Sequence, residues 1–346
     1  MIRVEASPNG AAEAAHHLLL VSGAILKSGN WLISTQHESR GDTHMRSIAF
    51  ALPAAALMSA GAVDQVQAQT PQYVKALPVA TAPLSMVPRT AYFLGLGGSF
   101  NSTSFTDQNI FAQGVSDIFL NGTQVAFGSA GGPADPSLNS KNGLSPTIQA
   151  GFFQHFTGTD WLWGAKVSYT YLHAGSTDSN VVVPQVGSFT SANSDTFTGN
   201  VVIRSYQVSL EHQLNFIPFI GHSFDRSMVY FGVGPALFQT RSKLNGVIGF
   251  AAINNTHVNI TGTPSNFSSS PWMIGGAATI GGTYFLSPSW FLDCSYTFAM
   301  SESRTTSFSA PFASATDGYT DTGILSGNYS GRVVTQSVAI SINKAF

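Results

Sequence analysis

Hydrophobic and polar residues alternate with a period of two in eight separate segments between residue 91 and the end of the chain. This alternation indicates β-strands, because successive side chains of a strand point to opposite faces. Each segment has about ten residues or somewhat more, the length at which a tilted strand crosses a bilayer. The eight segments are 91–100, 147–156, 161–173, 202–216, 228–238, 272–286, 290–300 and 333–346.

The clearest segment reads WLWGAKVSYTYLH and covers residues 161–173. Trp, Val and Tyr occupy one face, whereas Gly, Lys, Ser and Thr occupy the other. In a soluble β-sandwich the outer face meets water and usually carries charges, but here the second face is small and polar, as a narrow lumen requires. The pattern therefore predicts an all-β fold: a transmembrane antiparallel up-and-down β-barrel of eight strands.

Aromatic residues gather near the ends of these segments, as the two interfacial girdles of a membrane barrel require. One predicted girdle consists of Tyr92, Phe156, Trp161, Phe216, Tyr284, Trp290 and Phe346. The other consists of Phe100, Tyr171, Tyr206, Trp272 and Phe298.

The connections between the segments alternate in length. Short to moderate connections follow the second, fourth and sixth segments. Because such barrels place short turns in the periplasm and long loops outside, both chain ends are expected on the periplasmic side. The long connections, rich in Ser, Thr, Asn and Gly, are predicted extracellular loops over residues 101–146, 174–200, 239–270 and 302–332.

Residues 45–68 have the three parts of a secretory signal peptide. Arg46 supplies the positive charge, an apolar run follows, and small residues precede a predicted cleavage between Ala68 and Gln69. Residues 1–44 are then either a wrongly assigned N-terminal extension, with translation beginning at Met45, or a long signal extension. Residues 69–88, rich in Pro and Ala, are predicted to form a periplasmic tail, and residues 89–346 the barrel.

Composition narrows the class of protein further. Charged residues make up 9% of the chain, against about 25% in ordinary soluble domains. No basic patch indicates a nucleic-acid partner, and no apolar run after residue 68 is long enough for a membrane helix. Cys294 is the single cysteine, so no disulfide forms within one chain.

Three charged residues fall on lumen-facing positions by this alternation: Lys166, Glu211 and Asp293. Lys166 and Glu211 lie on neighbouring segments at similar depth, so we expect them to form an ion pair. Asp293 should reach them from across the lumen, because an eight-stranded barrel is narrow enough for side chains to meet. The alternative is that lumen water solvates each charge separately.

Candidate catalytic chemistry is sparse. An outer-membrane hydrolase needs a carboxylate, a histidine and often a serine together near the outer rim. Glu211 and His212 are adjacent in a strand, but adjacent strand residues face opposite sides. We therefore expect no enzymatic activity, no catalytic residues, no cofactor and no metal site.

The chain resembles the small outer-membrane β-barrels of Gram-negative bacteria, such as the membrane domain of OmpA, opacity-type surface antigens and related "porin family" proteins. The resemblance covers residues 89–346 and includes the C-terminal strand SVAISINKAF. There, Val338, Ile340, Ile342 and Phe346 match the pattern that the outer-membrane assembly machinery recognises in that family.

The resemblance implies a location in the outer membrane of a Gram-negative bacterium. The implied partners are outer-membrane lipid and lipopolysaccharide, the assembly machinery through the C-terminal strand, and an unknown extracellular ligand of the loops. The expected function is a structural anchor that presents surface loops, of an adhesion or antigen type. A narrow channel for small solutes is the alternative, and an outer-membrane enzyme is the third interpretation.

Overall fold

The computed structural model describes residues 85–191, 197–253 and 256–346. The predicted signal peptide, the cleavage site at Ala68 and Gln69, and most of the predicted tail lie outside the described residues. None of the described residues forms a helix long and apolar enough to cross a membrane.

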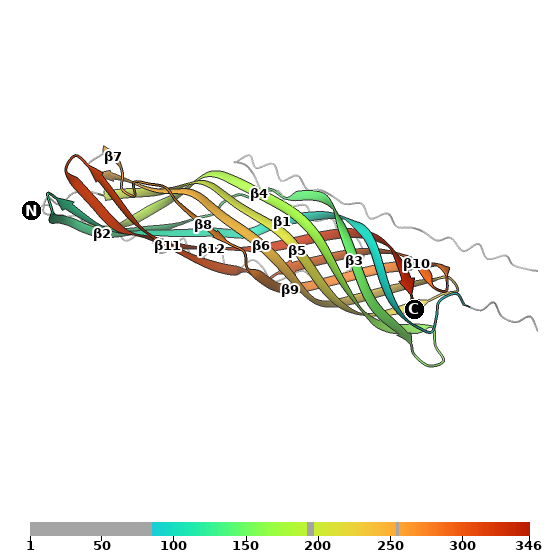
Figure 1. Ribbon diagram of the computed structural model, residues 1–346. Coiled ribbons are helices and arrows are strands. Elements are labelled where there is room, and N and C mark those ends of the chain that lie inside the picture. The colour runs from blue at the N-terminus through green and yellow to red at the C-terminus, as the bar shows by residue number, and fades with distance from the viewer. Residues whose placement is uncertain (1–84, 192–196, 254–255) are drawn as a thin grey trace, which may run out of the picture. The chain divides into compact units, whose positions relative to one another are not determined.

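Twelve strands build the described part of the chain, and eight of them close into an antiparallel ring (Figure 1). The order around the ring is β1, β3, β4, β5, β6, β9, β10 and β12, and β12 pairs with β1. This confirms the predicted eight-stranded up-and-down barrel. The strands are β1 (Thr90–Leu120), β2 (Thr123–Ala134), β3 (Lys141–His155), β4 (Trp161–Ser191), β5 (Phe197–Ser223), β6 (Ser227–Ile253), β7 (Thr256–Asn259), β8 (Ser265–Ser269), β9 (Trp272–Ser287), β10 (Trp290–Ser301), β11 (Arg304–Thr316) and β12 (Tyr319–Ala345).

One end of the barrel, which we call the turn end, carries three short connections at residues 156–160, 224–226 and 288–289. The start of β1 and the end of β12 lie at the same end. There the backbone N–H of Phe346 donates to the carbonyl of Tyr92 at 2.9 Å, and the N–H of Tyr92 donates back at 3.3 Å. This reciprocal pair completes the closure between the first and last strands.

The opposite end, which we call the hairpin end, differs from the prediction. The long connections were expected to be loops, but most of their residues extend the strands into β-hairpins. Two hairpin tips explain why, because Asn121-Gly122 and Asp317-Gly318 have φ of 50°, 83°, 51° and 82°. Positive φ at both central residues defines the type I′ turn that matches the twist of paired strands, and Asn-Gly and Asp-Gly are its preferred sequences.

Seven of the eight predicted segments have the expected inward and outward faces, and β5 is the exception. A bulge between Leu210 and His212 shifts its register against β6, and β4 is irregular at the same place, between Tyr171 and Ala174. Below this bulge the alternation is as predicted. On the hairpin side of the bulge the inward and outward faces are exchanged, because one extra residue moves each further side chain to the opposite face of the strand.

The barrel interior has three zones. An apolar and aromatic cluster fills the turn end, a polar zone occupies the middle, and a second apolar cluster continues into the hairpins. The turn-end cluster contains Val87, Ala91, Phe93, Phe153, Leu162, Phe219, Met228, Tyr230, Phe285, Phe291 and Ala345.

Candidate functional site

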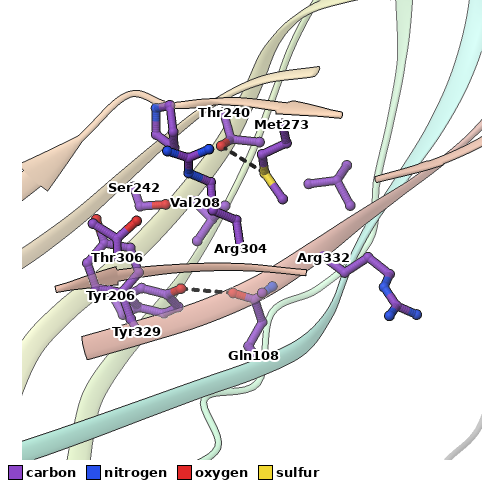
Figure 2. A pocket seen from close by; sticks show the side chains of 13 residues that line it. Gln108, Tyr206, Val208, Thr240, Ser242, Met273, Arg304, Thr306, Tyr329 and Arg332 are labelled. Carbon is purple, nitrogen blue, oxygen red and sulfur yellow. Dashed lines mark hydrogen bonds between the residues drawn. The ribbon is translucent and has the colours of Figure 1, made fainter. Parts of the chain in front are cut away.

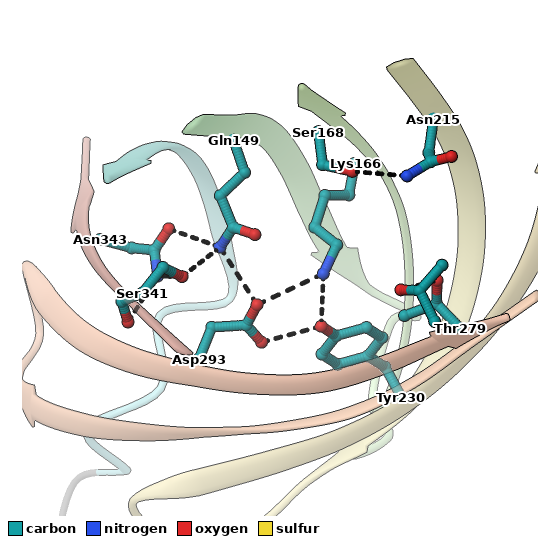
Figure 3. A network of polar contacts seen from close by, with 10 residues as sticks. Gln149, Lys166, Ser168, Asn215, Tyr230, Thr279, Asp293, Ser341 and Asn343 are labelled. Carbon is teal, nitrogen blue, oxygen red and sulfur yellow. Dashed lines mark hydrogen bonds and ion pairs between the residues drawn. The ribbon is translucent and has the colours of Figure 1, made fainter. Parts of the chain in front are cut away.

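The polar zone is centred on a buried ion pair (Figure 3). The Lys166 ammonium lies 3.3 Å from a carboxylate oxygen of Asp293, and both side chains are almost fully buried. Lys166 also donates to the Tyr230 hydroxyl at 2.6 Å, and this hydroxyl donates to the other Asp293 oxygen at 2.8 Å. Three side chains from three strands thus form a closed triangle in which each charge has a partner.

Gln149 joins this triangle to the wall formed by β12. Its side-chain amide donates to Asp293 at 3.1 Å, to the Ser341 hydroxyl at 2.8 Å and to the Asn343 side-chain oxygen at 2.8 Å. Sequence reasoning missed both Gln149 and Tyr230. A signal for Tyr230 was present, because it is an aromatic residue on the inward positions of its strand, between the outward Val229 and Phe231.

These contacts cross the barrel. β4 and β10 lie on opposite sides of the ring, so the Lys166–Asp293 pair spans the interior. β5 and β12 are also opposite, and the Thr335 hydroxyl donates to Gln213 between them at 3.0 Å. The interior at these levels is therefore occupied by side chains in direct contact, as the diameter of an eight-stranded barrel allows.

Aromatic rings fill the turn end below the ion pair. Phe285 stacks on Phe291 with a centroid distance of 4.9 Å, and Phe291 meets Phe93 edge-on at 5.5 Å. Phe219 lies 5.1 Å from the Tyr230 ring, whose face also holds the Lys166 ammonium at 4.8 Å. The rings and the ion pair therefore form one continuous packed unit.

A smaller polar group lies towards the hairpins (Figure 2). The Tyr206 hydroxyl donates to the Gln108 side chain at 2.8 Å, and its ring lies 6.1 Å from that of Tyr329 across the interior. Beside them is a cavity of about 30 Å³, which Arg304 and Arg332 also line. Its volume suffices for one or two water molecules.

The prediction that Glu211 faces the lumen and pairs with Lys166 is wrong. Glu211 is the extra residue of the β5 bulge, and its carboxylate lies 2.9 Å from the ring of His173, which is largely exposed on the outer wall. The pairing failed because the alternation was extended through residue 211 without an interruption. Of the three predicted lumen charges, the structure brings together Lys166 and Asp293.

The groups around Glu211 also bear on catalysis. The Ser209 hydroxyl donates to one Glu211 oxygen at 2.8 Å, and His173 binds the other. A carboxylate thus separates the serine from the histidine, whereas a nucleophilic serine needs direct contact with its base. Nδ1 of the neighbouring His212 is hydrogen-bonded to the Tyr169 hydroxyl at 2.7 Å.

Two of the predicted girdle residues are misplaced. Tyr206 is 1% exposed and points inward, because it lies above the bulge. Phe216 faces outward but pairs with Val167 in mid-strand, since β5 continues to Ser223. The other predicted girdle residues are exposed on the outer wall, namely Tyr92, Phe100, Phe156, Trp161, Tyr171, Trp272, Tyr284, Trp290, Phe298 and Phe346.

Large apolar side chains are exposed on the outer face of every strand of the ring. In a water-soluble protein a continuous surface of this kind is rare, because its contact with water is unfavourable. The predicted assembly residues Val338, Ile340, Ile342 and Phe346 belong to this surface. Further members are Leu94, Leu96, Ile148, Trp163, Val167, Phe216, Ile220, Val229, Phe231, Val233, Ile274, Ile280 and Leu292, and Cys294 is exposed among them.

No family model matches the sequence, and no curated protein is significantly similar to it. Among solved structures, the chain is similar to Ail, the attachment invasion locus protein of Yersinia pestis, with 12% identity and a TM-score of 0.21 over 68% of this chain and 98% of Ail. It is similar to the outer membrane protein OprG from Pseudomonas aeruginosa, with 11% identity and a TM-score of 0.33 over 76% and 99% of the two chains. It is similar to Neisserial surface protein A, with 13% identity and a TM-score of 0.24 over 70% and 95%.

Proposed function

We propose that this protein is an outer-membrane β-barrel of a Gram-negative bacterium that anchors its long hairpins at the cell surface, as an adhesion- or antigen-type protein. The observation that supports this most directly is the contact between opposite walls of the interior. The Lys166–Asp293 pair and the Gln213–Thr335 hydrogen bond occupy the space that a diffusing solute would need. The ordered hairpins are then the part of the barrel that is available for function.

The outer surface supports the membrane placement. Its apolar side chains from every ring strand match the band that lipid covers in such barrels, about 25 Å tall. We propose that the turn end faces the periplasm, where the assembly machinery would recognise the C-terminal strand that ends at Phe346. The hairpin end then faces outward.

The hairpins also offer apolar contacts to an extracellular ligand. Val115 on β1 and Ile324 on β12 are cross-strand partners, and both remain half exposed on the hairpin wall. Val186 on β4 is 85% exposed. Exposed aliphatic side chains on paired strands are suited to binding a protein or glycan partner, because the strand pairing sets the positions of their backbones before binding.

A narrow channel is the second candidate function, and the polar zone around Gln149, Lys166 and Asp293 favours it over an inert wall. The aromatic cluster at the turn end opposes it, because Phe153, Phe285 and Phe291 are completely or almost completely buried there.

Planar-bilayer recording on the full refolded chain separates these two functions. The anchor predicts no steady unitary currents at moderate voltage. Reproducible openings of constant amplitude would contradict the anchor and establish the channel. A porin refolded and inserted in the same way serves as the positive control.

Orientation is tested by thiol labelling of intact cells in a background where Cys294 is replaced by Ser. Thr123→Cys at a hairpin tip should react with a membrane-impermeant maleimide, whereas Thr157→Cys in a turn should react only after the outer membrane is opened. Both positions are exposed, so their intrinsic reactivity is comparable. The reverse pattern would contradict the proposed orientation.

A further inference from the structure

A hollow of about 250 Å³ lies on the wall formed by β4, β5 and β6, towards the hairpin end. Arg241, Lys243 and His173, the basic residues of the hollow, belong to its lining together with Gly175. The remaining lining residues are mostly hydroxyl and amide side chains, namely Ser176, Thr177, Gln207 and Ser209, with Val208 and Glu211.

The strand register explains why these groups converge. Gly175 pairs with Ser209, which pairs with Arg241 on the next strand. One step further towards the hairpins, Thr177 pairs with Gln207, and Gln207 pairs with Lys243. Two adjacent cross-strand rows therefore each end in a cation. Because residues two apart on a strand share one face, Arg241 and Lys243 lie on the same face of β6.

Neither of the two cations on β6 is held in a close ion pair with a described residue, although the charge of Arg241 acts on the nearby carboxylate of Glu211. Among the described residues, the ion pairs within 4 Å are Lys166–Asp293, His173–Glu211 and Arg332–Asp107, so neither Arg241 nor Lys243 takes part in one. Glu211 is the negative group that faces the hollow, and its oxygens already accept from His173 and Ser209. The hollow thus carries more positive than negative charge.

The position of the hollow relative to an aromatic row bears on which anion would fit it. Tyr171, His212, Gln239 and Trp272 form one cross-strand row over four strands, and Tyr171 and Trp272 are exposed on it. Aromatic rows of this kind mark the level of lipid headgroups. Arg241 and Lys243 follow Gln239 by two and four residues towards the hairpins, so they lie just beyond that level, where headgroup phosphates are found.

We infer that this hollow binds a phosphate group of a phosphorylated lipid in the leaflet at the hairpin end. A guanidinium and an ammonium on neighbouring strands provide charge-assisted hydrogen bonds to phosphate oxygens, and the adjacent hydroxyl groups complete the shell. The inference rests on the proposed membrane placement. It adds to that proposal the chemical class of lipid that would bind the outer wall.

The test measures binding of lipid A carrying both phosphates to the full chain refolded in detergent, by native mass spectrometry across a lipid titration. The unmodified chain should bind this lipid more tightly than the same lipid after enzymatic removal of its phosphates. Arg241→Gln and Lys243→Gln should each weaken binding about tenfold, as the loss of one charge-assisted hydrogen bond predicts. Lys141→Gln removes an equivalent exposed charge outside the hollow and should leave affinity unchanged.

A second variant has the opposite expected sign. Glu211→Gln removes the carboxylate that faces the same hollow and should tighten binding of phosphorylated lipid A severalfold. If Glu211 merely stabilises the bulge, Glu211→Gln should weaken the binding of phosphorylated lipid A or leave it unchanged. Equal affinity for phosphorylated and dephosphorylated lipid, or equal effects of Arg241→Gln and Lys141→Gln, would overturn the inference.

The outcome is independent of the proposed anchor function. Unitary currents with intact phosphate-dependent binding would refute the anchor and keep the lipid site. A correctly oriented barrel that shows no unitary currents and no phosphate-dependent binding would refute the lipid site and keep the anchor.

Discussion

Lys166 on β4 and Asp293 on β10 project from opposite sides of the eight-stranded ring, and their charged atoms meet 3.3 Å apart in the interior. Tyr230 bridges them, and both side chains are almost fully buried. The pair therefore links two strands that are far apart around the barrel wall.

Removing one partner should be strongly destabilising, because the other charge would remain buried without compensation. We expect Lys166→Met to lower the free energy of unfolding by about 3–5 kcal/mol, the usual effect of breaking a buried pair. Equilibrium unfolding by denaturant in lipid vesicles measures this.

The double variant Lys166→Met with Asp293→Asn tests the cause. It should be more stable than Lys166→Met alone, since no uncompensated charge is left and Asn still offers an acceptor to Gln149. A double variant as unstable as the single one would show that lost packing of the lysine stem, and not charge, accounts for the effect.

Asp321 makes the stability of one hairpin depend on pH. Burial and, less strongly, the charge of Asp117 raise the pKa of this carboxyl group from its ordinary value of 3.8 to about 6, against the opposing effect of a hydrogen bond from Ser116. At a pH between these two pKa values, Asp321 is mostly protonated in the folded chain and mostly ionised in the unfolded chain. Hairpin stability should therefore fall as the pH rises through this window, and the contribution of Asp321 is fully lost above about 6.

Hydrogen exchange of amides in the β11–β12 hairpin, corrected for intrinsic rates, measures this dependence. Asp321→Asn should remove it and protect the hairpin at neutral pH. The exposed Asp135→Asn changes the net charge equally and should leave the dependence in place. Equal protection of the unmodified hairpin at pH 4.5 and 7.5 would count against the buried carboxyl group as its origin.

The sequence was sufficient to predict the ring itself, because a period of two is a local property that each segment shows by itself. The same locality explains the failures. The bulge at Glu211 inserts one residue, and nothing in the alternation around it marks the insertion, so the faces of Tyr206 and Glu211 were both assigned wrongly. Lys166 and Asp293 were placed inward because their strands are regular at those positions.

The hairpin extensions were missed for another reason. Small and polar residues make up much of their outer walls, so the alternation weakens. Asn121-Gly122 and Asp317-Gly318 were strong turn signals within these stretches. A search for such dipeptides would have predicted two of the hairpins despite their loop-like composition.

Phe346 is predicted to matter for assembly, and the structure separates two contributions. Its backbone makes the reciprocal hydrogen bonds with Tyr92, whereas its ring is exposed on the outer wall. Deleting Phe346 removes both, whereas Phe346→Ala removes the ring alone. We expect slow insertion and periplasmic degradation for the deletion, measured by the heat-modifiable folded band after a pulse of labelling. Normal membrane levels of the deletion variant would show that this residue is not part of an assembly signal.

Gly164 should be required for the aromatic packing at the turn end. A Cβ atom at this position would overlap the Phe152 carbonyl oxygen and lie 2.6 Å from the Phe219 ring, far inside normal contact. The carbonyl belongs to the neighbouring strand and cannot move without disturbing the ladder, so Gly164→Ala should force Phe219 and the β3–β4 pairing to shift. We expect a loss of about 1–3 kcal/mol in the free energy of unfolding, the usual effect of overpacking.

Gly143→Ala is the matched control, because it also lies in a ring strand but no atom would lie within 4 Å of a Cβ atom added there. If both variants unfold at the same denaturant concentration as the unmodified chain, the turn end is less tightly packed than these distances indicate.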